Sequence, residues 1–269
     1  MTDLRSSVSG GTAMGSIQFK KGEQNAGIIS LDISESNAFT VEALELLGQA
    51  LKEAREAAQK GEIKSLLLLS ERSGYFSAGL DLVALGSASD LGQVLGFFYN
   101  NLEELYTMPV PVISGIRGHA LGYGCMLALM GDYRLMSDAG VRVGLPEVKM
   151  GIRIPSIVIY ELQKVVGYTE ANRQVLEGLA LKSQEALNCG FADSLHPEQE
   201  IQSKALAIAG KFKKSSSAGL AGIREASRME AHAFRKLLKR DLEENLKSLD
   251  HPDAQEGLAA AQEGRRPKF

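Results

Sequence analysis

Two glycine-containing turns are the parts of this sequence whose residue types could stabilise a negative charge. The stretches FSAG (76–79) and GHALGYGCMLAL (118–129) each run from a strand-like segment through small residues toward a helix. Such a turn leaves backbone N–H groups unpaired and pointing outward. Two such turns facing each other would stabilise a carbonyl oxygen that gains charge in a transition state, typically by a few kcal/mol per donor. The sequence therefore predicts an oxyanion hole without an accompanying nucleophile.

A third stretch supplies a candidate base. In GLPEVKMGI (144–152), Glu147 follows a proline in an apolar loop. Burial there would raise the pKa of its carboxyl group and make it a usable general base near neutral pH. The alternative is an exposed loop carboxylate beside Lys149.

Two other groups could act as nucleophiles, but the sequence favours structural roles for both. Cys125 would lie at a helix N-terminus, which lowers a thiol pKa, yet a small apolar packing residue is the preferred interpretation. His119 with Ser114 could form a Ser/His hydrolase site, but no orienting acid is identifiable.

The elements that would position these residues alternate between strands and helices, which indicates an α/β fold. A tail (1–16) precedes two short strands within 17–33, a helix from Thr40 to Gly61 and a strand at 63–70 that is apolar throughout. Further along we expect helices at 91–107 and 122–130 and strands at 110–118, 132–137 and 141–148. From residue 156 the pattern becomes helical, with predicted helices at 156–166, 169–178, 183–189, 198–213 and about 220–249.

Composition sets limits on partners and compartment. The 269 residues are 44% hydrophobic and carry a formal net charge of −3, which does not indicate a nucleic-acid or anionic-membrane partner. The two cysteines, Cys125 and Cys189, are expected as free thiols, so we predict a cytoplasmic protein. No apolar run reaches the roughly 20 residues that cross a bilayer.

Four stretches together resemble the crotonase superfamily of enoyl-CoA hydratases and isomerases. They are FSAGLDL (76–82), GHALGYGCMLALMGDYRLMS (118–137), GLPEVKMGI (144–152) and the terminal EGLAAAQEGRRPKF (256–269). The resemblance covers about residues 16–269. It implies a spiral of strand-strand-helix (ββα) units at 17–200 and a C-terminal helical, trimerising region at 201–269, assembled as a homotrimer or hexamer.

The resemblance also implies an acyl-CoA thioester substrate, no metal and no separate cofactor. The thioester carbonyl would lie between the amides of Ala78 and Tyr123 and be stabilised as an enolate. Tyr123 stands where the superfamily usually has glycine, so a positive φ there would be strained and the ring would crowd the acyl pocket. The residues predicted to line the substrate site around these donors are Phe76, Ser77, Gly79, Asp81, Gly122 and Met126.

The resemblance implies that the side chains at positions 126 and 147 determine which reaction is catalysed. Hydratases of the superfamily carry acids at the positions of Met126 and Glu147, and a thioether cannot activate water. Glu147 alone could move a proton from C2 to C4, so the sequence is most similar to the isomerases that shift a double bond from position 3 to position 2. The alternatives are a hydratase, another crotonase-type lyase or hydrolase, and a non-catalytic acyl-CoA binder.

A basic cluster on the predicted long helix is expected to form a solvated face, although the phosphates of CoA would need one or two such cations. Its members are Arg224, Arg228, Arg235, Lys236, Lys239 and Arg240.

Overall fold

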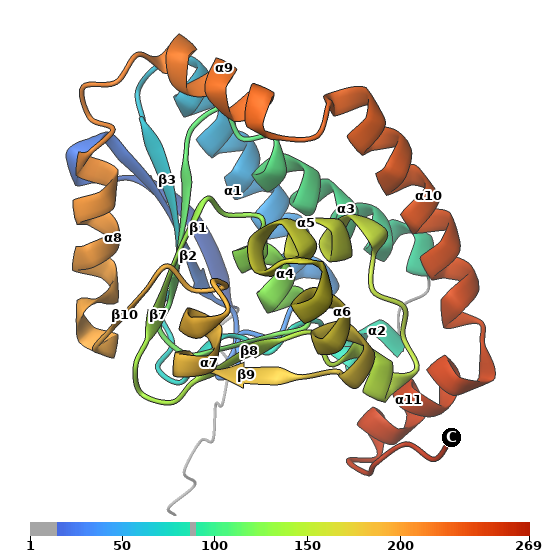
Figure 1. Ribbon diagram of the computed structural model, residues 1–269. Coiled ribbons are helices and arrows are strands. Elements are labelled where there is room, and N and C mark those ends of the chain that lie inside the picture. The colour runs from blue at the N-terminus through green and yellow to red at the C-terminus, as the bar shows by residue number, and fades with distance from the viewer. Residues whose placement is uncertain (1–14, 87–89) are drawn as a thin grey trace, which may run out of the picture.

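Two β-sheets carry the fold (Figure 1). The computed structural model describes residues 15–86 and 90–269. Among these residues the larger sheet has six strands, in the order β1 (Ser16–Lys21), β2 (Ala26–Asp32), β3 (Ser65–Ser70), β5 (Val112–Ile116), β7 (Tyr133–Ser137) and β10 (Ser194–His196). The smaller sheet has four, in the order β4 (Tyr75–Ser77), β6 (His119–Leu121), β8 (Arg142–Gly144) and β9 (Ala180–Lys182).

The chain alternates between the two sheets. Strand β3 lies in the larger sheet, β4 follows in the smaller one, and helices come next; β5 and β6, then β7 and β8, repeat the same step. Neighbouring strands from β2 to β10 in the larger sheet are parallel, whereas β1 and β2 form an antiparallel hairpin. This repeated strand-strand-helix step is the α/β spiral that the sequence predicts.

The leucine run of β3 shows why the larger sheet can be buried on both faces. Leu66 and Leu68 belong to the main core, while Leu67 and Leu69 pack on the opposite side with residues of α8 (Ile201–Gly210), such as Ala205. Figure 1 shows α8 alone on that side of the sheet, with the other helices around the main core on the far side. A strand covered on both faces needs an unbroken apolar run, as the sequence has.

The remaining helices complete the fold. They are α1 (Val41–Gln59), α2 (Leu82–Gly86), α3 (Leu91–Tyr106), α4 (Tyr123–Leu129), α5 (Ser156–Val166), α6 (Tyr168–Glu177), α7 (Ser183–Asn188), α9 (Ser217–Ser227), α10 (Ala231–Leu249) and α11 (Pro252–Gln262), with short 3₁₀ turns η1 (Glu23–Asn25), η2 (Glu147–Met150) and η3 (Glu198–Glu200). Helix α1 begins as predicted, because the Thr40 hydroxyl accepts a hydrogen bond from the amide of Ala43 at 3.3 Å. No helix in the described ranges is long and apolar enough to cross a membrane.

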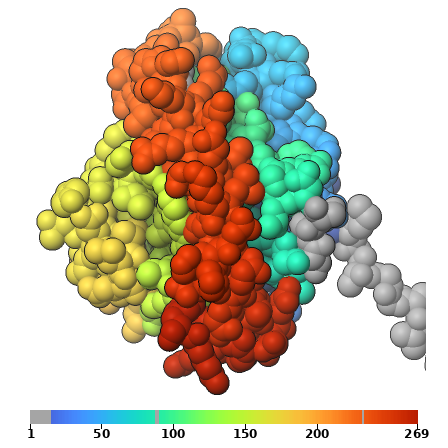
Figure 2. Space-filling view, turned by 90° about the vertical axis from the view of Figure 1, so that its right-hand side faces the viewer, coloured from blue at the N-terminus to red at the C-terminus, as the bar shows by residue number. Residues whose placement is uncertain are grey.

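The prediction of one helix over 220–249 is wrong. The chain leaves the helical conformation at Arg228, whose φ of −102° and ψ of 169° are extended, and α10 starts after Glu230. The Glu230 carboxylate caps the new helix by accepting hydrogen bonds from the amides of His232 and Ala233. Figure 2 shows the resulting C-terminal segment, orange to red, running as a band down one face of the molecule.

Other boundaries also differ from the sequence predictions. The strand expected at 141–148 ends at Gly144, and η2 follows it, so Glu147 lies in a turn rather than a strand. The three-residue strands β9 and β10 and the terminal helix α11 were not predicted from the sequence. Of the tail predicted at 1–16, residues 1–14 lie outside the described residues, and the division into core and helical region stays a prediction.

Candidate active site

The two predicted turns lie next to each other because β4 and β6 are parallel neighbours in the smaller sheet. Tyr75 pairs with His119 and Ser77 with Ala120, so both strands end at the same edge. The turn after β4 continues to Leu80, and the turn after β6 leads through Gly122 into α4. The parallel pairing therefore places the backbone amides of both turns at one place.

The free amide of the first turn is not the one predicted. The amide of Ala78 donates to the carbonyl of Ser36 at 2.9 Å, and that of Gly79 donates to the Ser77 hydroxyl at 3.1 Å. The amide of Asp81 donates to the carbonyl of Phe39. Within the part of the chain that the structure describes, this leaves the Leu80 amide as the donor of the turn without a partner. The expected donor at Ala78 is therefore corrected to Leu80, two residues further on.

The second turn has a free amide at Tyr123, as expected. Tyr123 is the first residue of α4, where a backbone N–H has no acceptor within the helix, and no described residue accepts from it. The positive φ falls on Gly122, at +54°, so the strain expected at Tyr123 is absent. Its ring does not block the cavity, since it is buried between Phe39 and Phe98 with centroid distances of 5.1 and 4.6 Å.

Gly79 keeps the space in front of the Tyr123 amide open. Its φ is +101°, and a Cβ built on it would stand 3.3 Å from the Tyr123 nitrogen and 3.0 Å from the carbonyl oxygen of Leu121. A side chain here would fill the region where a ligand oxygen could reach the amide.

Glu147 lies beside these amides. Its Oε1 atom is 3.3 Å from the point where a Cβ on Gly122 would stand, and its Oε2 atom is buried with no hydrogen-bond partner among the described residues. Burial raises the pKa of Glu147 to about 7. A carboxyl group with this pKa is partly ionised at neutral pH and can both take and return a proton.

Helix α11 holds the turn that carries Glu147. A Cβ on Gly257 of α11 would stand 2.0 Å from the carbonyl oxygen of Met150, at the end of η2, so the two backbones are in direct contact. Gly151 closes the turn with a φ of +64°. The C-terminal segment thus supports the turn that carries Glu147 from outside the sheets.

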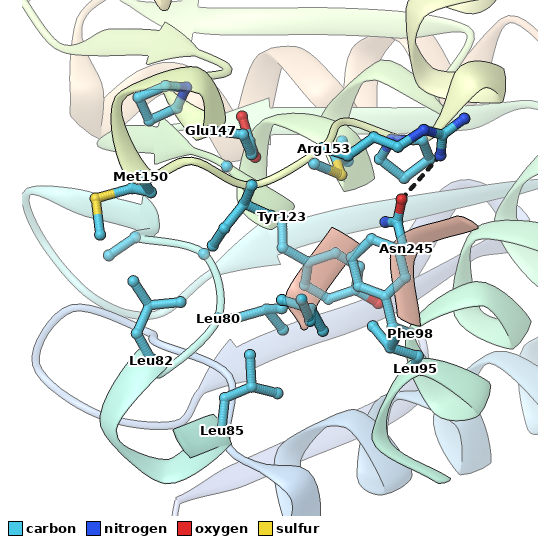
Figure 3. A pocket seen from close by; sticks show the side chains of 18 residues that line it. Leu80, Leu82, Leu85, Leu95, Phe98, Tyr123, Glu147, Met150, Arg153 and Asn245 are labelled. Carbon is cyan, nitrogen blue, oxygen red and sulfur yellow. Dashed lines mark hydrogen bonds between the residues drawn. The ribbon is translucent and has the colours of Figure 1, made fainter. Parts of the chain in front are cut away.

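These groups surround a cavity of about 140 Å³ (Figure 3). Its wall is mostly apolar, with leucines below Glu147 in the view and Met126 of α4 as a further lining residue. Apart from Tyr123, its ionisable or amide side chains among the described residues are Glu147, Arg153 and Asn245. Neither Arg153 nor Asn245 is marked by the sequence, because Arg153 follows the GLPEVKMGI motif and Asn245 lies among the many polar residues of α10.

The other predicted site residues, together with Ala78, fall into two groups. Gly79, Gly122 and Met126 line the cavity, as does Ala78, whereas Phe76, Ser77 and Asp81 do not. Phe76 is fully buried in the core, and the Ser77 hydroxyl donates to the carbonyl of Asn37 at 2.7 Å. Asp81 starts α2 by accepting hydrogen bonds from the amides of Val83 and Ala84. These three residues shape the turn rather than face the cavity.

The alternative nucleophiles lie elsewhere. Ser114 is buried in β5 and donates to the carbonyl of Ala128, while Nδ1 of His119 accepts from the amide of Arg142 at 2.9 Å. Burial raises the pKa of the Cys125 thiol, opposite to the effect expected from a helix N-terminus. Neither the Ser/His pair nor a reactive cysteine is therefore present in a catalytic arrangement.

Two members of the basic cluster are not on a solvated face, which corrects that expectation. Arg224 is buried, and its Nε donates to Asp132 at 2.7 Å; Arg228 donates to the other oxygen of Asp132 at 2.7 Å and lies over the ring of Tyr106. Arg235 is exposed and pairs with Glu103. Lys236, Lys239 and Arg240 are exposed, as expected.

The alternating sheets, the paired turns and the buried acid define a crotonase-type α/β spiral enzyme. Residues 23–269 match the family model described as enoyl-CoA hydratase/isomerase, and the chain belongs to this family. It is similar to the human mitochondrial enoyl-CoA delta isomerase 1, with 30% identity over 174 residues, which are 63% of this chain and 57% of that protein. A probable enoyl-CoA hydratase of Bacillus subtilis (strain 168) is 28% identical over 92% of this chain and 96% of its own length.

Solved structures show the same fold. The crystal structure of human mitochondrial delta3-delta2-enoyl-CoA isomerase superposes with a TM-score of 0.85 at 23% identity, covering 94% of this chain and 98% of that one. The chain is therefore an enzyme of the enoyl-CoA hydratase/isomerase family, with relatives of both kinds.

Proposed function

We propose that this enzyme converts 3-enoyl-CoA to 2-enoyl-CoA, with Glu147 as the proton shuttle. The observation that carries the proposal is a single carboxyl group, with a pKa raised to about 7, in an apolar cavity beside two unpartnered amides. The amides of Leu80 and Tyr123 would receive the thioester oxygen.

The proposed reaction balances without any other reactant. The Glu147 carboxylate removes a proton from C2, and the electron pair moves into the thioester carbonyl to give an enolate. The enolate oxygen is stabilised by the two amide donors. Electrons then flow back toward C4, which takes the proton from Glu147 while the double bond forms between C2 and C3. The substrate gains and loses no atoms or electrons, so the proposed reaction requires no cofactor.

The absence of a second acid at position 126 favours isomerisation over hydration. Met126 is 3% exposed and lines the cavity with a thioether, which cannot hold or deprotonate a water molecule. An apolar wall also helps to keep water away from the enolate.

Hydration is the second candidate, and its support is the similarity to the probable hydratase of Bacillus subtilis. A non-catalytic acyl-CoA binder is the third, but a binder has no chemical need for a buried carboxyl group with a raised pKa.

Assays with purified protein separate the candidates. We expect 3-hexenoyl-CoA to be converted to the conjugated 2-isomer, seen as a gain in ultraviolet absorbance, and 2-hexenoyl-CoA to keep its absorbance. Glu147→Gln should reduce kcat by a factor of about 10² to 10⁴ while leaving binding of hexanoyl-CoA largely intact. Glu177→Gln, at an exposed glutamate of α6, is the matched control.

Loss of 2-hexenoyl-CoA absorbance without isomerisation would favour the hydratase. Tight binding of the saturated ester with no turnover of either substrate would favour the binder.

Assembly and location belong to the proposal as well. We expect a homotrimer or hexamer formed through residues 201–269, to be measured by light scattering on the purified protein. The cytoplasmic location stays a prediction.

A further inference from the structure

One end of the cavity is polar, and the proposed proton transfer does not use it. Arg153, in the loop after η2, and Asn245, on α10, both line the cavity. Figure 3 shows them together, apart from Glu147. The rest of the wall on that side is apolar, including Leu95 and Phe98.

The hydrogen bond between these two residues fixes which way the Asn245 amide points. Nη1 of Arg153 lies 2.8 Å from Oδ1 of Asn245. A guanidinium group can only donate, so Asn245 must present its oxygen to Arg153 and its NH₂ group elsewhere. Figure 3 shows the oxygen turned toward Arg153 and the nitrogen turned away from it.

The Asn245 NH₂ group has no acceptor among the described residues, although the side chain is largely buried, with 7% of the residue exposed. Arg153 itself is held in place by hydrogen bonds to two further residues. Its Nη2 donates to Ser156 at 2.7 Å and to Asp241 at 2.9 Å. The cavity therefore contains an oriented hydrogen-bond donor, the Asn245 NH₂ group, that has no protein acceptor among the described residues.

At the polar end of the cavity, the positive charge of Arg153 is balanced by the negative charge of Asp241. Asp241 is fully buried, pairs with Arg153 through one oxygen, and accepts the amide of Ile157 at 3.1 Å with the other. Among the described residues that line the cavity, no unpaired cation remains to neutralise a carboxylate, and a buried unpaired carboxylate is unfavourable. A neutral oxygen acceptor suits the site better.

We infer that Asn245 determines substrate specificity by donating a hydrogen bond to a neutral oxygen, such as a keto or hydroxyl group, on the acyl chain beyond the reacting carbons. Arg153 and Asp241 are positioning residues that keep the donor facing the cavity. This inference rests on the proposed acyl-CoA site, and it names the class of acyl group that the site prefers.

Equilibrium binding of saturated esters tests the inference without any turnover. Isothermal titration calorimetry would compare 4-oxohexanoyl-CoA and 5-oxohexanoyl-CoA with 4-methylhexanoyl-CoA and 5-methylhexanoyl-CoA, in which a methyl group replaces each oxygen. We expect at least one keto ester to bind about fivefold or more tightly than its methyl counterpart. Adipoyl-CoA, which ends in a carboxylate, should bind more weakly than that keto ester.

Variants test whether Asn245 causes the preference for the keto ester over the methyl ester. Asn245→Leu removes the donor, and Asn245→Asp replaces it with an acceptor of similar shape, so both should lose the fivefold preference. Arg153→Lys keeps a cation beside Asp241 but loses the planar guanidinium group that orients Asn245, so it should reduce the preference for the keto ester over the methyl ester. Asn188→Leu, at an exposed asparagine of α7, should keep the preference. Thermal melting of each variant verifies folding.

Equal binding of keto and methyl esters by the native enzyme, or tighter binding of adipoyl-CoA, would overturn the inference. So would a preference that survives in both Asn245 variants. If no saturated ester binds, the inference fails, and turnover of 3-hexenoyl-CoA decides separately whether the proposed reaction fails with it.

Discussion

Gly122 lies directly beneath Glu147: a Cβ on Gly122 would stand 3.3 Å from Oε1 of the carboxyl group. The same residue has a φ of +54° and a ψ of −123°, a conformation that side chains strongly disfavour, and it precedes the free amide of Tyr123. One glycine therefore orients the Tyr123 amide and leaves room for the Glu147 carboxyl group. Its replacement should affect both.

We expect Gly122→Ala to lower kcat/KM at least tenfold and to reduce the free energy of unfolding by about 1–3 kcal/mol, the usual range for such backbone strain. Gly222→Ala is the control, since Gly222 lies in α9 with no atom within 4 Å of its added Cβ. That change should keep the activity and stabilise the helix by up to about 1 kcal/mol. Steady-state kinetics and urea unfolding give both quantities. Native activity in Gly122→Ala would contradict the arrangement.

The pH dependence of the rate should report on Glu147. Burial raises its pKa to about 7, and the proposed base must be ionised to accept a proton. We therefore expect kcat/KM for 3-hexenoyl-CoA to rise about tenfold per pH unit below pH 7 and to level off above it. A rate that stays constant down to pH 5.5 would show that another group is the base.

Because of the same burial, ionisation of Glu147 at high pH should lower the free energy of unfolding. The pKa in the folded state, about 7, is above the ordinary value of 4.5 in the unfolded chain, so between these values the folded state binds more protons. Stability from this group is therefore present at low pH and lost as pH rises through 7. Between pH 5 and pH 8 the loss is about 2–3 kcal/mol.

Glu147→Gln has no proton to lose and should escape this effect. We expect its free energy of unfolding to gain about 2–3 kcal/mol relative to the native enzyme when urea unfolding is compared at pH 8 and at pH 5. A difference between the two proteins that does not change with pH would mean that Glu147 is solvated in the folded state.

The sequence carried enough information for strand β3 and for a buried acid at position 147, because local patterns determine both. The leucine run of β3 requires cover on two faces, and the proline before Glu147 sets an acid in an apolar turn. The donor at position 80 could not be identified in this way. It follows from the acceptors of its neighbours, Ser36 for Ala78 and Phe39 for Asp81, which are distant in sequence.

The polar end of the cavity was equally inaccessible to sequence reasoning. Asn245 lies 92 residues from Arg153, and nothing local marks it among the charged residues of α10. The break between α9 and α10 escaped notice for a similar reason. It contains no proline or glycine, and Arg224 and Arg228 beside it form hydrogen bonds with Asp132, which is distant in sequence.

The last prediction concerns the ion pairs by which Asp132 connects the core to the C-terminal helices. Asp132 receives Arg224 on one oxygen and Arg228 on the other, and its Oδ2 also accepts the amide of Val112 at 2.7 Å. Burial alone would raise the pKa of Asp132, but the two arginines lower it below its ordinary value. The carboxylate is therefore charged at neutral pH and balances two guanidinium groups that have little access to solvent.

Asp132→Asn should leave Arg224 without a counter-charge and Arg228 with only Glu161, whose Oε2 lies 3.6 Å from Nη1 of Arg228, and it should reduce the free energy of unfolding by about 3 kcal/mol at pH 7. Because Arg228 is part of the break between α9 and α10, limited trypsin digestion should also cut faster near residue 228 in this variant. Glu244→Gln, which removes an exposed pair with Lys247, should cost less than about 1 kcal/mol and leave the digestion pattern unchanged. If Asp132→Asn behaves like this control, the arginines do not anchor the C-terminal helices, and the orientation of α10, with Asn245 on it, must depend on Asp241 and its neighbours instead.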